Sequence, residues 1–422
     1  MPYIADLHLH SIYAYATSKS LTLENLARWA KIKGIDLLAS ADFTHPAWFA
    51  ELNQKLIPNS GGLYQLDGVH FVLGTEVSCV YKQGGRQRRV HILLFAPDLA
   101  TVARLNQALS RHGNLKSDGR PTLTMSVRDL TALTLEINPN CIVLPAHAWT
   151  PWYGVFGSKS GFDSLEECFL DMSPAINAIE TGLSSDPEIN WAVRDLSDKT
   201  LVSFSDAHSL PKLAREVTAF QGPLTYQGLA QALAQNEVAY TVEFYPEEGK
   251  YHYDGHRKCG VCQPPAEIPI QAKPCPVCGK PLTLGVLNRA LLLSEGKVNG
   301  TRGGDGFVQS TEGRAPFIRL VPLQEIISEV LGQSPNTKKV QSVYFKMIEE
   351  VGSELQVLIN ANHHDLAGAS GERIAQAIIQ VRAGNIKVEP GYDGVFGKVS
   401  IASADLLRSE TQTAEMDQSV MA

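Results

Sequence analysis

At 422 residues the chain is long enough for two or three domains with sizeable cores. A hydrophobic fraction of 44% and a charged fraction of 19% are typical of a soluble globular protein. We find no apolar run near twenty residues, and the start of the chain lacks the charged and apolar regions of a signal peptide. These features exclude a membrane span and a secretory leader, so a cytoplasmic location is expected by default.

The formal net charge is −7, and the acidic excess lies wholly within residues 1–249. Two or three bound divalent cations would cancel most of that excess. The net charge therefore does not exclude a partner with a phosphate backbone, although it gives no support for one.

Short β-rich runs alternate with helical patterns over the first 240 residues. One helix is expected to start after Thr22, to place Leu23, Leu26, Ala27 and Ala30 on one face, and to end before Gly34. Strand–helix alternation predicts parallel strands in an α/β barrel or a doubly wound sheet, and polar groups from so many strand ends converge best in a barrel. The expected strands are 3–5, 35–40, 69–74, 90–95, 141–144, 176–179 and 201–204.

Most of these strands end in residues that bind metals. A lone histidine is more often a structural residue, but His8-x-His10 and Asp206-x-His208 place two ligands on one face. Glu180 also ends a strand, where orienting a ligand and a purely structural role are equally plausible. Histidines 70, 112, 252, 256, 363 and 364 lack such a context and are left out. The candidate ligands of two or three divalent ions (Zn, Mn or Mg) are His8, His10, Asp42, His45, Glu76, His91, His147, Asp206 and His208.

Four of the seven cysteines are clustered. Cys259-x2-Cys262 and Cys275-x2-Cys278 have the spacing of a structural zinc ribbon, which we favour over disulfides or a redox pair. A bound zinc ion would stabilise a small module that cannot form a core of its own. The remaining three are expected to be buried, unreactive thiols: Cys79, Cys141 and Cys168.

Two surface motifs are candidates for contacts with a nucleic acid. Arg86, Arg88 and Arg89 belong to an expected hairpin tip, for which a solvated turn is the simpler interpretation and phosphate contact the alternative. An aromatic cluster follows His147, where core packing and stacking on a base are weighed equally. Its members that we consider are Trp149, Trp152 and Tyr153.

The pattern changes near residue 244. We expect three domains: a barrel over 1–243, a zinc module over 244–283 and a mostly helical domain over 284–422. A glycine-rich mobile loop is expected over 296–315. The last twenty residues are polar and expected to fray. The helices predicted in this half are 283–295, 323–331, 337–358 and 371–383.

The first half resembles the PHP (polymerase and histidinol phosphatase) superfamily. The motifs that carry the resemblance are Asp6-Leu7-His8-Leu9-His10, Glu76, His91, His147 and Ser205-Asp206-Ala207-His208. This resemblance implies a distorted seven-stranded β/α barrel with two or three ions that cleaves phosphoesters, with Glu76, His147 and Asp206 as catalytic residues. The chain departs from the common Asp-His pattern, because Phe43 follows Asp42. Whether Asp42, His45 or both coordinate is left open.

Nearly the whole chain resembles the endonuclease Q family, in its order of modules and in three phrases. These phrases are 10–19, 42–46 and 391–397. The resemblance implies a DNA repair enzyme that cuts 5′ to deaminated bases (uracil, hypoxanthine, xanthine) or abasic sites, leaving a 3′-hydroxyl and a 5′-phosphate. Residues 284–422 would then help to recognise the lesion.

The implied partner is double- or single-stranded DNA, and the protein is expected to be a monomer. Recruitment by a sliding clamp is left open, because no convincing clamp-binding motif lies near the C-terminus. The rival hypotheses are a small-molecule phosphatase of the histidinol-phosphate kind and a non-catalytic scaffold. The phosphatase would not need residues 244–422, and a scaffold would be expected to have lost ligands.

Overall fold

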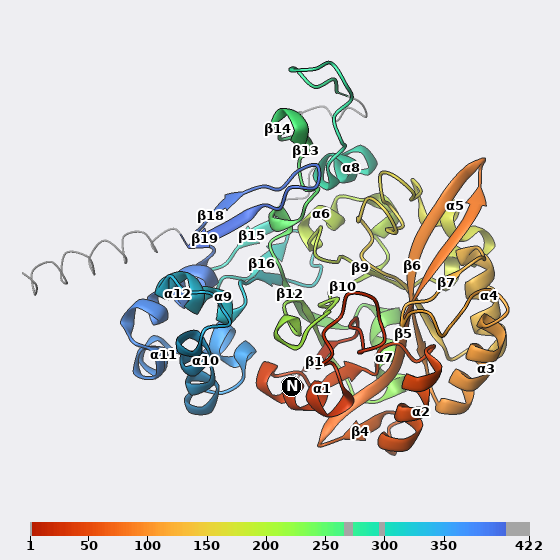
Figure 1. Cartoon of the computed structure of the whole chain (residues 1–422), viewed down its shortest axis with the longest axis horizontal. Coiled ribbons are helices and arrows are strands. Elements are labelled where there is room, and N and C mark those ends of the chain that lie inside the picture. Colours follow the sequence, from red (N-terminus) through yellow and green to blue (C-terminus); the bar gives the residue numbers. More distant parts are fainter. Residues whose placement is uncertain (1, 266–272, 295–299, 402–422) are drawn as a thin grey trace, which may run out of the picture.

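A mixed α/β fold is seen in the computed structural model, which describes residues 2–265, 273–294 and 300–401 (Figure 1). One large sheet lies at its centre, and a bundle of helices follows late in the chain. No helix in these ranges is long and apolar enough to cross a membrane. The α/β class and the helical C-terminal region predicted from the sequence are confirmed, and the tail predicted to fray lies outside the described residues.

The strands that lead to the predicted ligands lie side by side in the sheet. β1 (Tyr3–Asp6) pairs in parallel with β2 (Leu37–Ala39), which pairs in parallel with β5 (Val69–Gln83). β5 and β6 (Arg86–Ala96) form a long antiparallel hairpin, and β6 pairs with β8 (Ile142–Pro145). This order brings segments that are far apart in the sequence to one region of the sheet.

Some strands, among them β6, run against the parallel direction that strand–helix alternation suggested. β6 follows β5 through a tight turn at Gly84 and Gly85, which both have positive φ angles, and a two-residue turn can join only antiparallel strands. β11 (Val217–Phe220) is likewise antiparallel to β1. The prediction of an all-parallel arrangement is therefore wrong for β6 and β11.

The ladder of backbone hydrogen bonds does not close into a ring among the described residues. β9 (Ala178–Glu180) and β10 (Thr200–Val202) form a separate two-stranded sheet. Isolated hydrogen bonds connect this small sheet to its neighbours. The Ala148 N–H, after β8, donates to the Glu180 carbonyl at the end of β9 (3.0 Å). The Ser203 N–H, after β10, donates to the Thr218 hydroxyl of β11 (2.9 Å). A closed barrel remains a prediction.

Local signals explain helix α1 (Leu23–Lys33). The Thr22 side chain accepts the Asn25 N–H at its start, and Gly34 ends it with a φ of +88°, a conformation that favours glycine. Its predicted apolar face is buried. Both ends and the buried face agree with the sequence prediction.

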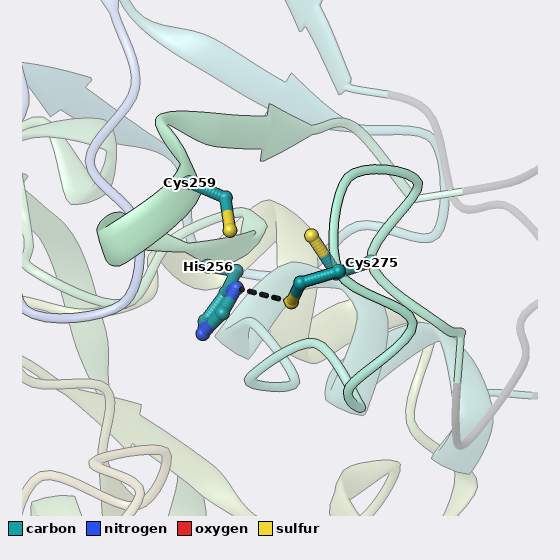
Figure 2. Close-up of side chains that lie close together, drawn as sticks. His256, Cys259 and Cys275 are labelled. Atoms are coloured by element: carbon teal, nitrogen blue, oxygen red, sulfur yellow. Dashed lines mark hydrogen bonds between the residues drawn. The ribbon is translucent and has the colours of Figure 1, made fainter.

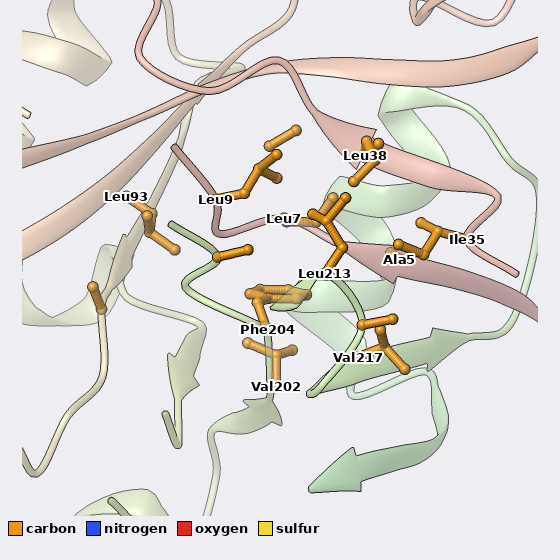
Figure 3. Close-up of a cluster of buried hydrophobic side chains, with 14 of the residues drawn as sticks. Ala5, Leu7, Leu9, Ile35, Leu38, Leu93, Val202, Phe204, Leu213 and Val217 are labelled. Atoms are coloured by element: carbon orange, nitrogen blue, oxygen red, sulfur yellow. The ribbon is translucent and has the colours of Figure 1, made fainter. Parts of the chain in front are cut away.

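Side chains of the extended segment 7–10, which follows β1, point alternately into the core and toward the metal-binding groups. Leu7 and Leu9 are buried in the apolar cluster of Figure 3, where they lie near Phe204. His8 and His10, which alternate with them, lie on the opposite face. Because burying one leucine stabilises the fold by roughly 1.5–3 kcal/mol, the leucines fix the orientation of the two histidines.

The glycine-rich stretch after residue 299 is a hairpin that extends the central sheet. β15 (Gly300–Arg302), β16 (Val308–Ser310) and β17 (Phe317–Arg319) continue from β12 (Val238–Glu243). Gly306, with a φ of +89°, turns so close to the Arg382 carbonyl that a side chain would collide with it. The predicted irregular loop is therefore wrong where β15 and β16 pair, over residues 300–310. These strands belong to the same sheet as strands of the first half of the chain. The division into three domains remains a prediction.

A bundle of four helices follows, with one unpredicted break. They are α9 (Leu323–Leu331), α10 (Lys338–Glu350), α11 (His363–Ser370) and α12 (Glu372–Ala383). The expected single helix over 337–358 ends early because Gly352 has a φ of +130°, which no helix contains. Residues Gln356–Asn360 then form a short π-helix, and α11 was not predicted.

A buried ion pair joins this bundle to the first half of the chain. The Lys33 Nζ lies 2.6 Å from the Glu354 Oε2, and both side chains are at most 4% exposed. The Tyr344 hydroxyl and the Leu323 N–H donate to the same carboxylate, and Lys33 also donates to the Pro211 carbonyl. Each charge is fully paired, as burial requires.

We expect Lys33→Met to lower the free energy of unfolding by about 3–5 kcal/mol, because it leaves the Glu354 charge buried and unpaired. The double variant Lys33→Met, Glu354→Gln should recover part of that loss. Chemical denaturation would measure both, with Lys31→Met, an exposed position on the same helix, as the control. A loss no larger than that of the control would contradict the proposed role of this pair.

Candidate metal centre

Two groups of metal-binding side chains meet at the strand ends. The first consists of His8, His10, Glu76 and Asp206, and the second of Glu76, His91 and His147. Within each group the potential ligand atoms all lie within 4.8 Å of one another. The groups share Glu76, which lies in the middle of β5.

The two carboxylate oxygens of Glu76 face different groups. Oε2 lies 3.4 Å from the His8 Nε2 and 3.2 Å from the His10 Nε2. Oε1 lies 2.6 Å from the His91 Nδ1 and 3.1 Å from the His147 Nε2. One carboxylate placed in this way could bridge two ions.

The chemistry of these atoms fits divalent metal ions. Nε2 of His8, Nε2 of His10 and Oδ1 of Asp206 are buried and make no hydrogen bond with any described residue. Asp206 Oδ1 lies 3.5 Å and 3.3 Å from the two nitrogens. Buried polar atoms without partners are rare and costly. Imidazole with carboxylate is a suitable ligand set for zinc or manganese.

A second layer of side chains orients the ligands. Glu180 accepts a hydrogen bond from the His8 Nδ1 (2.9 Å) and from the His147 N–H (2.6 Å). Asp42 accepts from the His10 Nδ1 (3.1 Å) and from the Ser11 N–H (2.6 Å). Each carboxylate holds an imidazole so that the other ring nitrogen faces the centre. Glu180 was left undecided by the sequence, and its contacts favour the orienting role.

Three predicted ligands lie outside the two groups. Asp42 lies behind His10, as described above. The His45 ring stacks on Tyr13, with centroids 4.2 Å apart. His208 lies beside His10 (4.6 Å between centroids) and its Nδ1 contacts the Asp206 carbonyl. Coordination by these three residues remains a prediction, and the positions of Asp42 and His45 do not favour it.

Several site residues have strained backbones. Asp42, His147 and Asp206 have φ angles of +37°, +28° and +46°, in the left-handed region that side chains normally avoid. Gly182 packs so tightly on His147 that a Cβ there would lie 2.5 Å from the histidine's own Cβ. Backbone strain of this kind is concentrated at functional sites.

Electrostatics favour the metal-binding forms of Glu76 and His91. Burial disfavours the charge on Glu76, but the nearby Arg120 guanidinium, whose Nη1 lies 3.2 Å from Oε2, holds its pKa well below the usual range. Burial lowers the pKa of His91 to about 4, so this imidazole is neutral. Burial opposes the charge on His8 and His10, but the surrounding carboxylates raise their pKa values well above the usual range, so an ion bound there would replace a proton on each ring. Arg120 could not be found from the sequence, because no spacing rule links it to the strand ends.

The predicted nucleic-acid contacts have different environments. Trp149 is 1% exposed and donates to Asn190, which favours core packing over a base contact for this residue. Trp152 is exposed beside Tyr251. The Tyr153 ring lies against His91 (4.3 Å) and within 5.8 Å of the Arg89 guanidinium.

The cysteine cluster contains one unexpected member. Cys259, Cys275 and Cys278 lie with His256, their ligand atoms all within 4.8 Å, and Figure 2 shows His256 facing this cluster. Cys262 is exposed and outside the group, with its sulfur 3.9 Å from the Pro390 carbonyl. The signal for His256 is its spacing, since His256-x2-Cys259 repeats the Cys-x2-Cys interval.

The surroundings of Cys275 favour metal binding, and the isolated cysteines differ from it. Burial opposes the charge on Cys275, but the backbone N–H groups of Cys278 and Val277 lower its pKa to about 6, which favours the thiolate that metals bind. The three isolated cysteines are buried, as predicted.

Known proteins resemble this chain over most of its length. YqxK of Bacillus subtilis, an uncharacterized protein, is 29% identical over 418 residues, which cover 94% of this chain and 98% of YqxK. MJ0043 of Methanocaldococcus jannaschii, also uncharacterized, is 31% identical over 262 residues. The match covers 60% of this chain but only 31% of that longer protein. The family model described as the MJ0043 C-terminal domain matches residues 322–385.

Two solved structures share the fold almost completely. The lesion-specific endonuclease PfuEndoQ from Pyrococcus furiosus has a TM-score of 0.81 and 29% identity, covering 95% of this chain and 96% of its own. A structure of endonuclease Q in complex with a 27-mer duplex substrate carrying an abasic lesion at the active site has a TM-score of 0.81 and 30% identity. It covers 95% of this chain and 97% of that one.

Replacing Asp42 distinguishes a ligand from an orienting residue. We expect Asp42→Asn, whose amide oxygen can still accept from His10, to weaken metal binding by at most about 10-fold, and Asp42→Ala by roughly 10–100-fold. Metal affinity is measured by competition with a chelator, and Glu136→Ala, an exposed acidic position, is the control. Loss of one whole ion from the Asn variant would show that Asp42 coordinates directly.

The cysteine cluster makes a second prediction. We expect His256→Ala and Cys259→Ser to lose the structural ion and Cys262→Ser to keep it. Cobalt substitution followed by absorption spectroscopy counts the thiolate ligands, and the structure predicts three. If Cys262→Ser lost the ion while His256→Ala kept it, the four-cysteine set expected from the sequence would be correct instead.

Proposed function

The chain belongs to the endonuclease Q family, and from that premise we propose that it is a metal-dependent DNA repair endonuclease. Its substrate would be a strand that carries a deaminated base (uracil, hypoxanthine or xanthine) or an abasic site. The observation that carries the proposal is the pair of ligand groups sharing Glu76, set in a chain that matches an endonuclease Q–lesion complex over nearly its whole length.

The proposed reaction is hydrolysis of the phosphodiester 5′ to the lesion. A water oxygen bonds to phosphorus as the bond from phosphorus to O3′ breaks, which leaves a 3′-hydroxyl and a 5′-phosphate. The proton released by water passes to solvent, and O3′ takes one up. Divalent ions in the two groups, of which we propose two or three, would acidify the water and neutralise charge on the phosphate.

Side chains of this protein would position the attacking water and the metal ligands. Asp206 is the most accessible carboxylate of the two groups, with its side chain 25% exposed, so it can accept a hydrogen bond from the attacking water. Glu76 and His147 are held in place by Arg120 and Glu180. Arg120, 23% exposed, places one positive charge beside Glu76, where it would attract the phosphate. No side-chain nucleophile is needed.

The module around the cysteine cluster has a structural role in this proposal. We propose that one zinc ion is held by Cys259, Cys275, Cys278 and His256. The Arg257 N–H and the Thr283 hydroxyl donate to Asp393, in the 391–397 phrase. The module therefore contacts the turn that joins β18 (Ile386–Glu389) to β19 (Lys398–Ile401). Selectivity would come from flipping the damaged nucleotide, because lesions unpair at lower cost than normal bases.

The rivals have less support. A small-molecule phosphatase has no evident use for the described residues beyond 243. A non-catalytic scaffold would be free to lose ligands, whereas six of the predicted ligands lie together in the two groups.

End-labelled duplexes with one deoxyuridine, one deoxyinosine or one abasic site test the proposal. With manganese, magnesium or zinc we expect a single cut 5′ to the lesion and none in the undamaged duplex. Asp206→Asn should reduce cleavage by at least roughly 100-fold while lesion binding survives, whereas Asp198→Asn, an exposed acidic position, should behave as wild type.

Two outcomes would contradict this proposal. Equal cutting of undamaged DNA, or no cutting with any of the three metals, would exclude lesion-specific cleavage. Hydrolysis of a phosphomonoester without any cutting of DNA would favour the phosphatase.

A further inference from the structure

A polar cavity lies outside the metal centre. Its volume is about 470 Å³. Three parts of the chain line it: the tip of the β5–β6 hairpin, the loop 157–163 and the segment 281–289 that follows the cysteine cluster. The cavity therefore lies where the first half of the chain meets the cysteine module.

The lining of this cavity is positively charged. Arg86, Arg88, Lys159 and Arg289 contribute four positive charges, and two carboxylates contribute two negative ones, which leaves a formal charge of +2. One of the carboxylates, Asp163, is already paired with the Arg289 Nη2 (2.6 Å). A small anion would therefore be attracted to this site.

Arg289 makes the wall of the cavity rigid. Its Nε donates to the Phe156 carbonyl (3.0 Å), and its Nη2 donates to the Phe162 carbonyl (2.9 Å). This buried guanidinium holds the glycine-rich loop against α8 (Val286–Leu293), on which Arg289 lies. The cavity is thus built from fixed backbone and not from freely moving side chains.

Two buried donors point to a missing ligand. Arg88 is 8% exposed, and its guanidinium is held over the Phe162 ring and by the Gly161 carbonyl. Its Nε makes no hydrogen bond with any described residue, and neither does the buried Ser158 Oγ. A buried donor without a partner costs about 1–3 kcal/mol. An acceptor bound in the cavity would satisfy both groups.

We propose that this cavity binds one phosphate of the DNA backbone. A phosphate offers several acceptor oxygens, and guanidinium groups match its geometry. Arg86 and Arg88 lie on the face of β6 opposite to His91, because side chains alternate along a strand, so the cavity is separate from the metal centre.

The inference rests on the proposed function, because it takes DNA as the occupant. It goes beyond the hairpin tip singled out in the sequence by adding Ser158, Lys159 and Arg289. It also gives Arg88, which is buried, a specific role.

The test uses the full-length protein with the double variant Arg86→Ser, Lys159→Ser. Both side chains are exposed, and both residues line the cavity. The matched control is Arg104→Ser, Arg111→Ser, at exposed positions that do not line it. The unfolding midpoint and the metal content verify that each variant is folded.

Binding to lesion and undamaged duplexes is measured as a function of salt concentration. We expect the double variant to weaken binding equally for both duplexes and to reduce the slope of log affinity against log salt by about 1. The control pair should keep the wild-type slope. An unchanged slope in the double variant would overturn the proposal.

A scan with single neutral methylphosphonate linkages locates the phosphate. At one linkage the loss of wild-type affinity should equal the loss caused by the double variant, and the two losses should not add. If they add at every linkage, the cavity does not hold a backbone phosphate.

Inorganic phosphate, titrated calorimetrically, separates the sources of the anion. Binding of phosphate in the wild type, lost in the double variant, together with additive losses throughout the scan, would assign the cavity to free phosphate and overturn the DNA occupant. Should the wild type cut no DNA with any metal, the proposed function fails on its own. The slopes and the scan still decide what the cavity binds.

Discussion

One buried carboxylate imposes the central constraint on this molecule. Glu76 is fully enclosed, and a buried charge is tolerated only where opposite charge or hydrogen-bond donors surround it. The chain meets this requirement with four imidazoles from three segments and with the Arg120 guanidinium. Strand order, the alternation of leucines and histidines after β1 and the strained turns at Asp42, His147 and Asp206 all serve to bring those groups to one point.

The sequence predicted the ligands well because they follow strands or lie within them. A buried apolar run marks a strand, and its end indicates the position of His8, His10, His147 and Asp206. Glu76 and His91 lie inside the longer strands β5 and β6, and they were found because each adjoins or interrupts an apolar run. Residues on irregular segments carry no such mark. Arg120 precedes a proline in a long loop, and nothing local indicates that its side chain reaches Glu76. Asp42 could be found but not assigned, since a carboxylate behind an imidazole and one beside it have the same sequence signal.

The fold was predicted in the same uneven way. Capping residues and a buried face fixed α1, because both signals are local. Strand direction is not local, and the antiparallel pairing of β11 with β1 joins residues more than two hundred positions apart. The hairpin after residue 299 was also missed, since its glycines, which suggest a loop, are needed for a turn against Arg382. Exposure of Trp149 could not be judged from composition, because core and surface aromatics look alike.

The hairpin of β5 and β6 limits how this protein can change during evolution. Side chains alternate between the two faces of a strand, so one residue inserted into either strand would turn every following side chain to the opposite face. Glu76 and His91 depend on the same register, in which Ser78 is paired with His91. Changes in length are therefore tolerable only at the distal turn and in matched pairs of residues. Homologues should accordingly keep the spacing from Glu76 to Ser78 invariant while the turn at Gly84 and Gly85 varies.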